Sequence, residues 1–103
     1  MDVPQRIAPS ADALAAVCQR FGVHRLALFG SVLRSDFGPN SDVDVLIEFE
    51  PGRTPGYFRI FELEQELSHL FGERRVEART AQELSRHFRD DVVRHSRTLY
   101  VAA

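Results

Sequence analysis

The hydrophobic positions of this chain follow two periods, one typical of helices and one typical of strands. Helical spacing appears first between Ser10, which can cap a helix, and Gly22, which can end one. It returns over residues 57–71, the longest predicted helix, which Gly72 ends. The side chains predicted to face inward from these two helices are Leu14, Val17, Cys18, Phe21, Ile60, Leu63, Leu67, Leu70 and Phe71.

Strand-like segments alternate with these helices. His24 and Arg25 are predicted to lead into the first strand, and short helical segments are predicted between residues 80 and 96. The alternation predicts one α/β domain over residues 10–103, preceded by a leader of residues 1–9. The four predicted strands cover residues 26–29, 42–49, 74–79 and 99–101.

A tight turn follows the first predicted strand at Gly30 and Ser31. Ser31 can cap a short helix there, which would leave backbone N–H groups available to an anion such as phosphate. Glycine lets the backbone approach such an anion closely because it has no Cβ atom. Arg34 could reach the same phosphate or pair with Asp36 or Glu48. Taken alone, a Gly-Ser turn after a strand is more often purely structural.

Two aspartates open the second predicted strand. Period-2 alternation places Asp42 and Asp44 on one face, with their Cα atoms about 6–7 Å apart, and puts the apolar side chains on the other. Two such carboxylates need solvent, a cation or a metal to compensate their charge. Hard oxygen ligands at this spacing suit Mg²⁺ together with substrate phosphates. A phosphate-binding turn followed by such a pair is what an enzyme acting on nucleoside triphosphates requires.

The two halves together resemble a known signature. Gly30-Ser31, ten intervening residues and Asp42-x-Asp44 are similar to the motif of the DNA polymerase β-like nucleotidyltransferase superfamily. Residues 41–56 resemble the continuation found in its minimal nucleotidyltransferase (MNT) group, small prokaryotic domains usually paired with a HEPN-family toxin. The resemblance extends over residues 23–101. It implies the nucleotidyltransferase fold, an α/β architecture with a short mixed sheet of about four strands backed by helices.

The resemblance also implies roles for individual residues. Gly30 and Ser31 would bind the β- and γ-phosphates of ATP, with Arg34 a further candidate phosphate ligand by its position, and Asp42 and Asp44 would bind Mg²⁺. A third acidic residue is expected on the strand at residues 74–79, where the family usually has aspartate. This chain has Glu77 there, one methylene longer. The implied roles of Glu77 are metal ligand and catalytic carboxylate, and its alternative is a solvated glutamate on an edge strand.

The function implied is transfer of AMP from ATP onto a hydroxyl group of a HEPN-family toxin, which would make the protein an antitoxin. The alternative is a nucleotidyltransferase-fold antitoxin that has lost activity and acts by binding its toxin. A nucleic-acid polymerase or a tRNA-modifying enzyme is disfavoured, because a chain of 103 residues with net charge −2 has neither further domains nor a basic surface. Nucleic acid is therefore not an expected partner, whereas a homo-oligomer remains open.

Composition excludes several other sites. All 13 basic residues are arginine, so a Walker A lysine is absent. Cys18 is the single cysteine, which rules out an intrachain disulfide and a multi-cysteine metal site. An EF-hand starting at Asn40 would place Val45 where glycine is required, and a haloacid dehalogenase would need a longer chain. The chain has no apolar run of signal-peptide or transmembrane type, so a cytoplasmic location without membrane contact is expected.

Overall fold

The computed structural model describes residues 9–30, 42–80, 90 and 94–102. Ser31, Arg34 and the segment 81–89 lie outside these residues, as do residues 1–8 of the predicted leader. The described elements, in chain order, are α1 (Ala11–Phe21), β1 (Val23–Phe29), β2 (Val43–Phe49), α2 (Tyr57–Leu70), β3 (Val76–Arg79) and β4 (Arg97–Val101).

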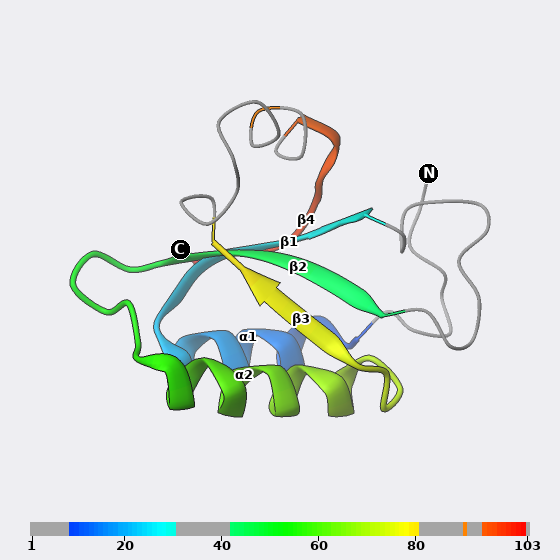
Figure 1. Ribbon diagram of the computed structural model, residues 1–103, viewed down its shortest axis with the longest axis horizontal. Helices are drawn as coiled ribbons and strands as arrows, with labels where there is room; N and C mark the ends of the chain where they lie inside the picture. The colour runs from blue at the N-terminus through cyan, green and yellow to red at the C-terminus, as the bar shows by residue number, and fades with distance from the viewer. Residues whose placement is uncertain (1–8, 31–41, 81–89, 91–93, 103) are drawn as a thin grey trace.

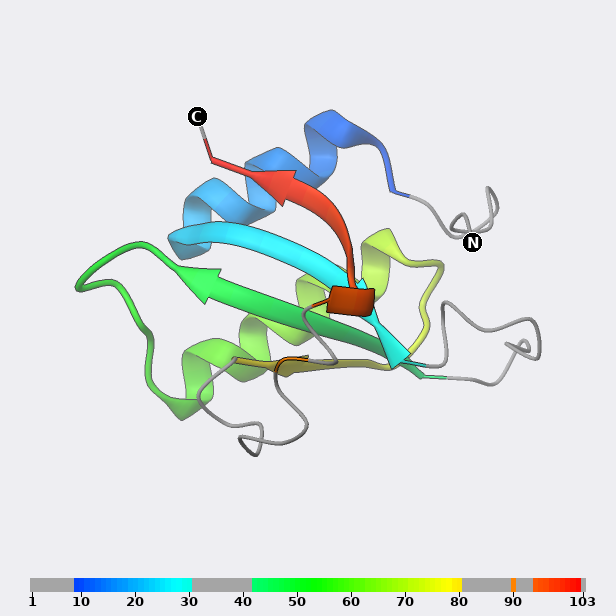
Figure 2. The same ribbon diagram turned by 90° about the horizontal axis from the view of Figure 1, so that it is seen from above.

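The four strands form one mixed sheet in the order β3-β2-β1-β4. β1 pairs antiparallel with both β2 and β4, whereas β2 pairs parallel with β3. The end of β1 and the start of β2 therefore meet at one end of the sheet, next to the start of β3 (Figures 1 and 2). This arrangement confirms the predicted α/β class with a short mixed sheet.

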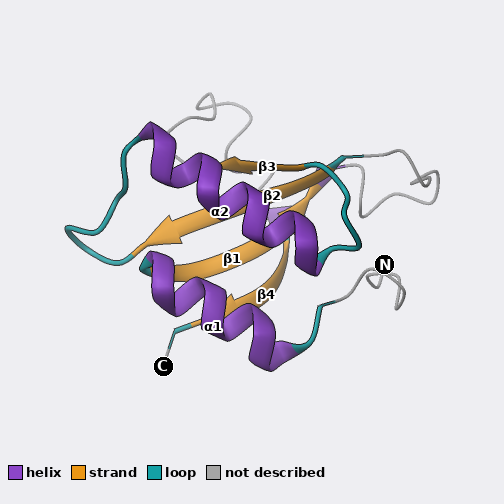
Figure 3. Cartoon of the chain, turned by 90° about the horizontal axis from the view of Figure 1, so that it is seen from below, coloured by secondary structure: helices purple, strands orange, loops and turns teal. Residues whose placement is uncertain are grey.

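Both described α-helices lie side by side across one face of the sheet (Figures 1 and 3). Their apolar stripes bury a core against alternate residues of the strands, which accounts for the helical and strand periods of the sequence. Burial also raises the pKa of the Cys18 thiol to about 12, as expected for a structural cysteine. The largest fully buried side chains are Phe71, Leu26, Leu28, Ile47, Leu63, Leu67, Val23, Val43, Val45 and Cys18.

The ends of α1 follow the predicted chemistry. The Ser10 hydroxyl accepts a hydrogen bond from the Ala13 N–H at 3.1 Å, which caps the first turn. Gly22 ends the helix in the left-handed conformation at φ 74°. α2 has no side-chain cap at its start and stops one residue earlier than predicted, with Phe71 as its C-cap. None of the helices in the described part of the chain is both long and apolar enough to cross a bilayer.

The starts of all four strands differ from the prediction: β2 and β3 begin one and two residues later, β4 begins two residues earlier, and β1 begins three residues earlier. β1 begins at Val23, so His24 and Arg25 lie within the strand and do not merely lead into it. Arg25 donates two hydrogen bonds to the Thr98 hydroxyl of β4, at 2.8 and 3.3 Å, and His24 accepts one from Ala102 through its carbonyl. The polar start of β1 is held by β4, a long-range pairing that a local apolar pattern does not encode.

Candidate active site

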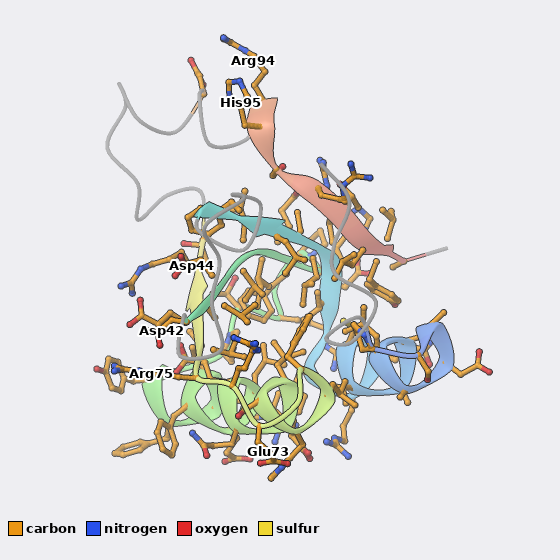
Figure 4. All side chains as sticks on the ribbon, turned by 90° about the vertical axis from the view of Figure 1, so that its right-hand side faces the viewer. Asp42, Asp44, Glu73, Arg75, Arg94 and His95 are labelled. Atoms are coloured by element: carbon orange, nitrogen blue, oxygen red, sulfur yellow. The ribbon has the colours of Figure 1, made fainter. Side chains whose placement is uncertain are left out.

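Asp42 and Asp44 lie at the start of β2, on the face of the sheet opposite the helices. Val43 and Val45 point into the helix-covered core and are fully buried, so the alternation leaves the two carboxylates on the other face. Both aspartates are half-buried. Figure 4 shows them on the same side of the sheet, close to the start of β3. The predicted acidic pair is thus presented together at one edge of the sheet.

Gly30 ends β1 directly beside Asp44. The pairing of β1 with β2 sets Phe29 opposite Asp44, and Gly30 follows with φ 76°. A Cβ atom added at Gly30 would lie 2.7 Å from Asp44 Oδ2, so the Asp44 carboxylate would have to shift to make room for it. The glycine is therefore needed for two reasons, its left-handed backbone and the room that it leaves for the carboxylate.

Glu77 lies next to Asp44 on the neighbouring strand. The parallel pairing of β2 with β3 sets Asp44 opposite Glu77, on strands about 4.8 Å apart. Val76 and Ala78 are buried toward the helices, so Glu77 faces the same side as the two aspartates. The Val43 N–H donates to the Arg75 carbonyl at 2.8 Å, which fixes this register at its start. Gly30, Asp44 and Glu77 thus lie beside one another across three neighbouring strands.

Two arginines hold the carboxylate of Glu77. Arg75 Nη2 lies 3.5 Å from Glu77 Oε1, and Arg79 Nη2 lies 3.5 Å from Glu77 Oε2. The Glu77 side chain is 31% exposed, so it is neither buried nor freely solvated. Glu77 therefore lies on an edge strand, partly exposed and paired with two arginines.

Glu64 of α2 secures the strand that carries Glu77. Its Oε2 accepts a hydrogen bond from the Ala78 N–H at 2.8 Å, in a partly buried position. β3 is an edge strand, and this carboxylate satisfies an N–H group on its outer side. β3 is therefore held by hydrogen bonds along both of its edges, to β2 on one side and to Glu64 on the other.

Three residues around the site were not anticipated from the sequence: Glu64, Arg75 and Arg79. The alternation of Arg75, Glu77 and Arg79 at every second position was the one available signal, because it places all three on one face of a strand. Glu64 gave no signal, since its partner is a backbone N–H of a strand 14 residues away.

The oxygen donors of Asp42 and Asp44 fit a hard divalent cation such as Mg²⁺. Because Gly30 has no Cβ atom, the Asp44 carboxylate has room beside the end of β1. Among the described residues, however, no three His, Cys, Asp or Glu side chains converge on one point to form a closed metal cage. Asp42 and Asp44 are thus the primary candidate ligands, and Glu77 is directed to its arginines.

Comparisons with known proteins show the family of this chain. Residues 11–99 match the family model of the nucleotidyltransferase domain. A protein adenylyltransferase named MntA from Thermococcus cleftensis is 41% identical over 54 residues, which is 52% of each chain. A candidate protein adenylyltransferase of Methanocaldococcus jannaschii is 43% identical over 54 residues, 52% of this chain and 53% of that one. The chain thus matches only about half the length of these curated relatives.

Solved structures share the fold. One of a candidate minimal nucleotidyltransferase is 34% identical with a TM-score of 0.67, over 84% of this chain and 85% of that one. A toxin–antitoxin structure with AMP-PNP has a TM-score of 0.69 at 19% identity, over 90% and 74% of the two chains. At that identity the likeness shows the fold alone. By the family model and by its fold, this chain belongs to the nucleotidyltransferase domain family.

Proposed function

We propose that this protein is a Mg²⁺-dependent nucleotidyltransferase that moves AMP from ATP onto a hydroxyl group of a HEPN-family toxin and so acts as its antitoxin. The observation that carries the proposal is the placement of Asp42 and Asp44 beside the Gly30 turn, in a chain of this family. The protein acceptor is supported by the relative named protein adenylyltransferase MntA. The toxin partner is supported by a solved MntA–HepT toxin–antitoxin structure of the same fold.

Each residue has a defined task in this reaction. Asp42 and Asp44 hold Mg²⁺, which when bound neutralises charge on the phosphates. Gly30 keeps the strand edge open, and Ser31 and Arg34 remain predicted phosphate ligands. The acceptor oxygen attacks the α-phosphorus, forming a P–O bond while the bond to the α,β-bridging oxygen breaks and pyrophosphate leaves. Glu77 takes the proton of the acceptor hydroxyl.

Rigid placement of these groups is the main contribution of the protein. Phosphoryl and nucleotidyl transfer depend chiefly on positioning and on electrostatic stabilisation, and both require side chains held in a fixed geometry. Here the ladder between β1, β2 and β3 fixes Gly30, Asp44 and Glu77 relative to one another. A lysine is not required for this chemistry.

The nucleotide site is tested by calorimetric titration of the protein with ATP in the presence of Mg²⁺. Replacing Asp42 and Asp44 together by Asn should abolish Mg²⁺-dependent binding and leave the circular dichroism spectrum unchanged. Glu48→Gln is the matched control, because Glu48 is an exposed carboxylate near the other end of the same strand. Equal ATP affinity in wild type and double variant would overturn the proposed site.

The acceptor is tested by label transfer from α-labelled ATP. The chain is co-expressed with the product of the neighbouring reading frame, and the purified pair is incubated with the labelled nucleotide. The proposal expects wild type and the Asp42→Asn/Asp44→Asn variant to form a stable complex with the partner. Only wild type should transfer label onto it. A neighbour of unrelated family, or failure to co-purify, would contradict the antitoxin role.

A second candidate function is a binding-only antitoxin that keeps the fold without activity. The observation in its favour is that both carboxylate oxygens of Glu77 face arginines. Comparing Glu77→Asp and Glu77→Gln in the transfer assay separates the two functions. Loss of transfer in Glu77→Gln supports the enzyme, whereas transfer by Glu77→Asp but not by wild type supports the binding-only antitoxin.

A further inference from the structure

Three charged side chains alternate along the open face of β3. Arg75, Glu77 and Arg79 share this face because Val76 and Ala78 between them are buried against the helices. Each guanidinium group lies 3.5 Å from a different oxygen of the Glu77 carboxylate. The carboxylate is therefore bracketed along the strand, with one cation on each side.

The same carboxylate is the register neighbour of Asp44, beside the candidate cation site. A second divalent cation that used Glu77 would have to displace at least one guanidinium group and would then lie beside two positive charges. Single exposed ion pairs are weak, but here two cations act on one half-buried carboxylate, and like-charge repulsion adds to the competition.

We propose that Arg75 and Arg79 are positioning residues that hold the Glu77 carboxylate and keep it from binding a divalent cation when no nucleotide is present. In this state the protein binds one cation, at Asp42 and Asp44, instead of two. This inference rests on the proposed function for its use of Asp42 and Asp44 as the cation site. It also gives the length of the glutamate a role, because a shorter aspartate would reach the two guanidinium groups less well.

The inference is tested by Mn²⁺ binding without nucleotide, followed by the electron paramagnetic resonance signal of the free ion. Wild type should bind one Mn²⁺. The double variant Arg75→Gln/Arg79→Gln should bind a second ion, or bind Mn²⁺ about tenfold more tightly, because its Glu77 is released. Adding Glu77→Gln to that double variant should remove the gain. Glu77→Asp alone should show part of it.

The control is the pair Arg53→Gln/Arg59→Gln, which makes the same change in net charge. Arg53 lies against Gly22 and Arg59 stacks on Phe21, at the opposite end of the sheet from Gly30. Arg59 also pairs with Glu62 at 2.9 Å, so the control releases a carboxylate too, at a place away from Asp44. Any gain in this pair reflects net charge or the release of that carboxylate and should fade as salt is added.

The possible results separate the two proposals. If the Arg75/Arg79 variant binds Mn²⁺ as the control pair does, or keeps its gain after Glu77→Gln, the positioning role is overturned. If Asp42→Asn/Asp44→Asn binds Mn²⁺ as tightly as wild type, the proposed cation site itself fails. Even with that second result, the role of Glu77 can still be measured, because it is taken from Arg75→Gln/Arg79→Gln with and without Glu77→Gln.

Discussion

The two faces of the sheet are held together by different forces. On the face under α1 and α2, strand side chains such as Leu28 and Val45 are fully buried among apolar neighbours. On the open face, Asp44, Glu77 and Arg79 are partly exposed, and Glu77 and Arg79 form an ion pair. Burial of apolar area stabilises the first face, whereas the second contributes little to stability and carries the charged groups. The helix-covered face thus supports the fold, and the open face is available for chemistry.

Both faces are built from the same strands, and β2 shows this most directly. Val43 and Val45 are fully buried, and Asp42 and Asp44 beside them are half-buried on the opposite side. Successive residues of one strand therefore serve stability and function in turn. A substitution at one position should affect one of the two properties and spare the other.

Val45→Asp should have the largest effect of the substitutions considered. It places an unpaired carboxylate at a position that is 0% exposed, and the expected loss is more than about 4 kcal/mol of unfolding free energy, enough to prevent folding. Asp44→Asn, one residue earlier, should change stability by less than about 1 kcal/mol while abolishing Mg²⁺-dependent ATP binding. Urea denaturation of the two variants measures the contrast. Equal midpoints would contradict the division of labour between the faces.

The helix-covered face could be predicted almost entirely from the sequence. Helical spacing and a capping residue located α1, and the inward residues predicted for it, Leu14, Val17, Cys18 and Phe21, are all buried. In α2 the predicted Leu63, Leu67 and Phe71 are fully buried, while Ile60 and Leu70 are only partly so. Periodic apolar patterns are local, and one face of a helix or strand expresses them directly.

The open face could be predicted only in part. The Gly-Ser and Asp-x-Asp pattern predicted Gly30, Asp42 and Asp44 as site residues, and the structure sets Gly30 beside Asp44. The contacts of Glu77 with Arg75 and Arg79 and the bond from Ala78 to Glu64 depend on strand order and on side-chain direction. A sequence without its sheet order does not encode which strands become neighbours.

Gly30→Ala should have an intermediate effect that reaches both stability and binding. The left-handed backbone at φ 76° costs about 1–2 kcal/mol for any residue with a Cβ atom. The added Cβ atom would also lie 2.7 Å from Asp44 Oδ2 and should displace this carboxylate from its place beside Gly30. Urea denaturation and calorimetric titration with ATP and Mg²⁺ should therefore both show a loss.

Gly52→Ala is a closely matched control for this prediction. Gly52 has the same φ of 76°, but a Cβ atom there would meet nothing within 4 Å. It should carry the backbone cost alone and leave ATP binding at the wild-type level. If the two alanine variants lose the same stability and bind ATP equally well, the contact between Gly30 and Asp44 has no functional weight.

Glu64→Ala should have the smallest effect. Glu64 lies on α2, on the helix-covered face, and bonds to β3, the edge strand that carries Glu77 on the open face. The Glu64 carboxylate on α2 accepts the Ala78 N–H at 2.8 Å, and losing this partly buried, charge-assisted hydrogen bond should cost about 1–2 kcal/mol. Alanine is a good helix former, so α2 itself should remain intact. Gln65→Ala is the control, at the adjacent exposed position of the same helix.

Amide hydrogen exchange reports this contact at a single residue. The Ala78 amide should exchange about tenfold faster in Glu64→Ala than in Gln65→Ala, since 1.4 kcal/mol corresponds to a factor of ten. Amides of β1, which pairs on both sides with other strands, should keep their protection. A local loss at Ala78 would show that a helix side chain holds β3 in place beside Asp44. If Ala78 kept its protection while the whole domain lost stability, Glu64 would act on the core and not on the strand that carries Glu77.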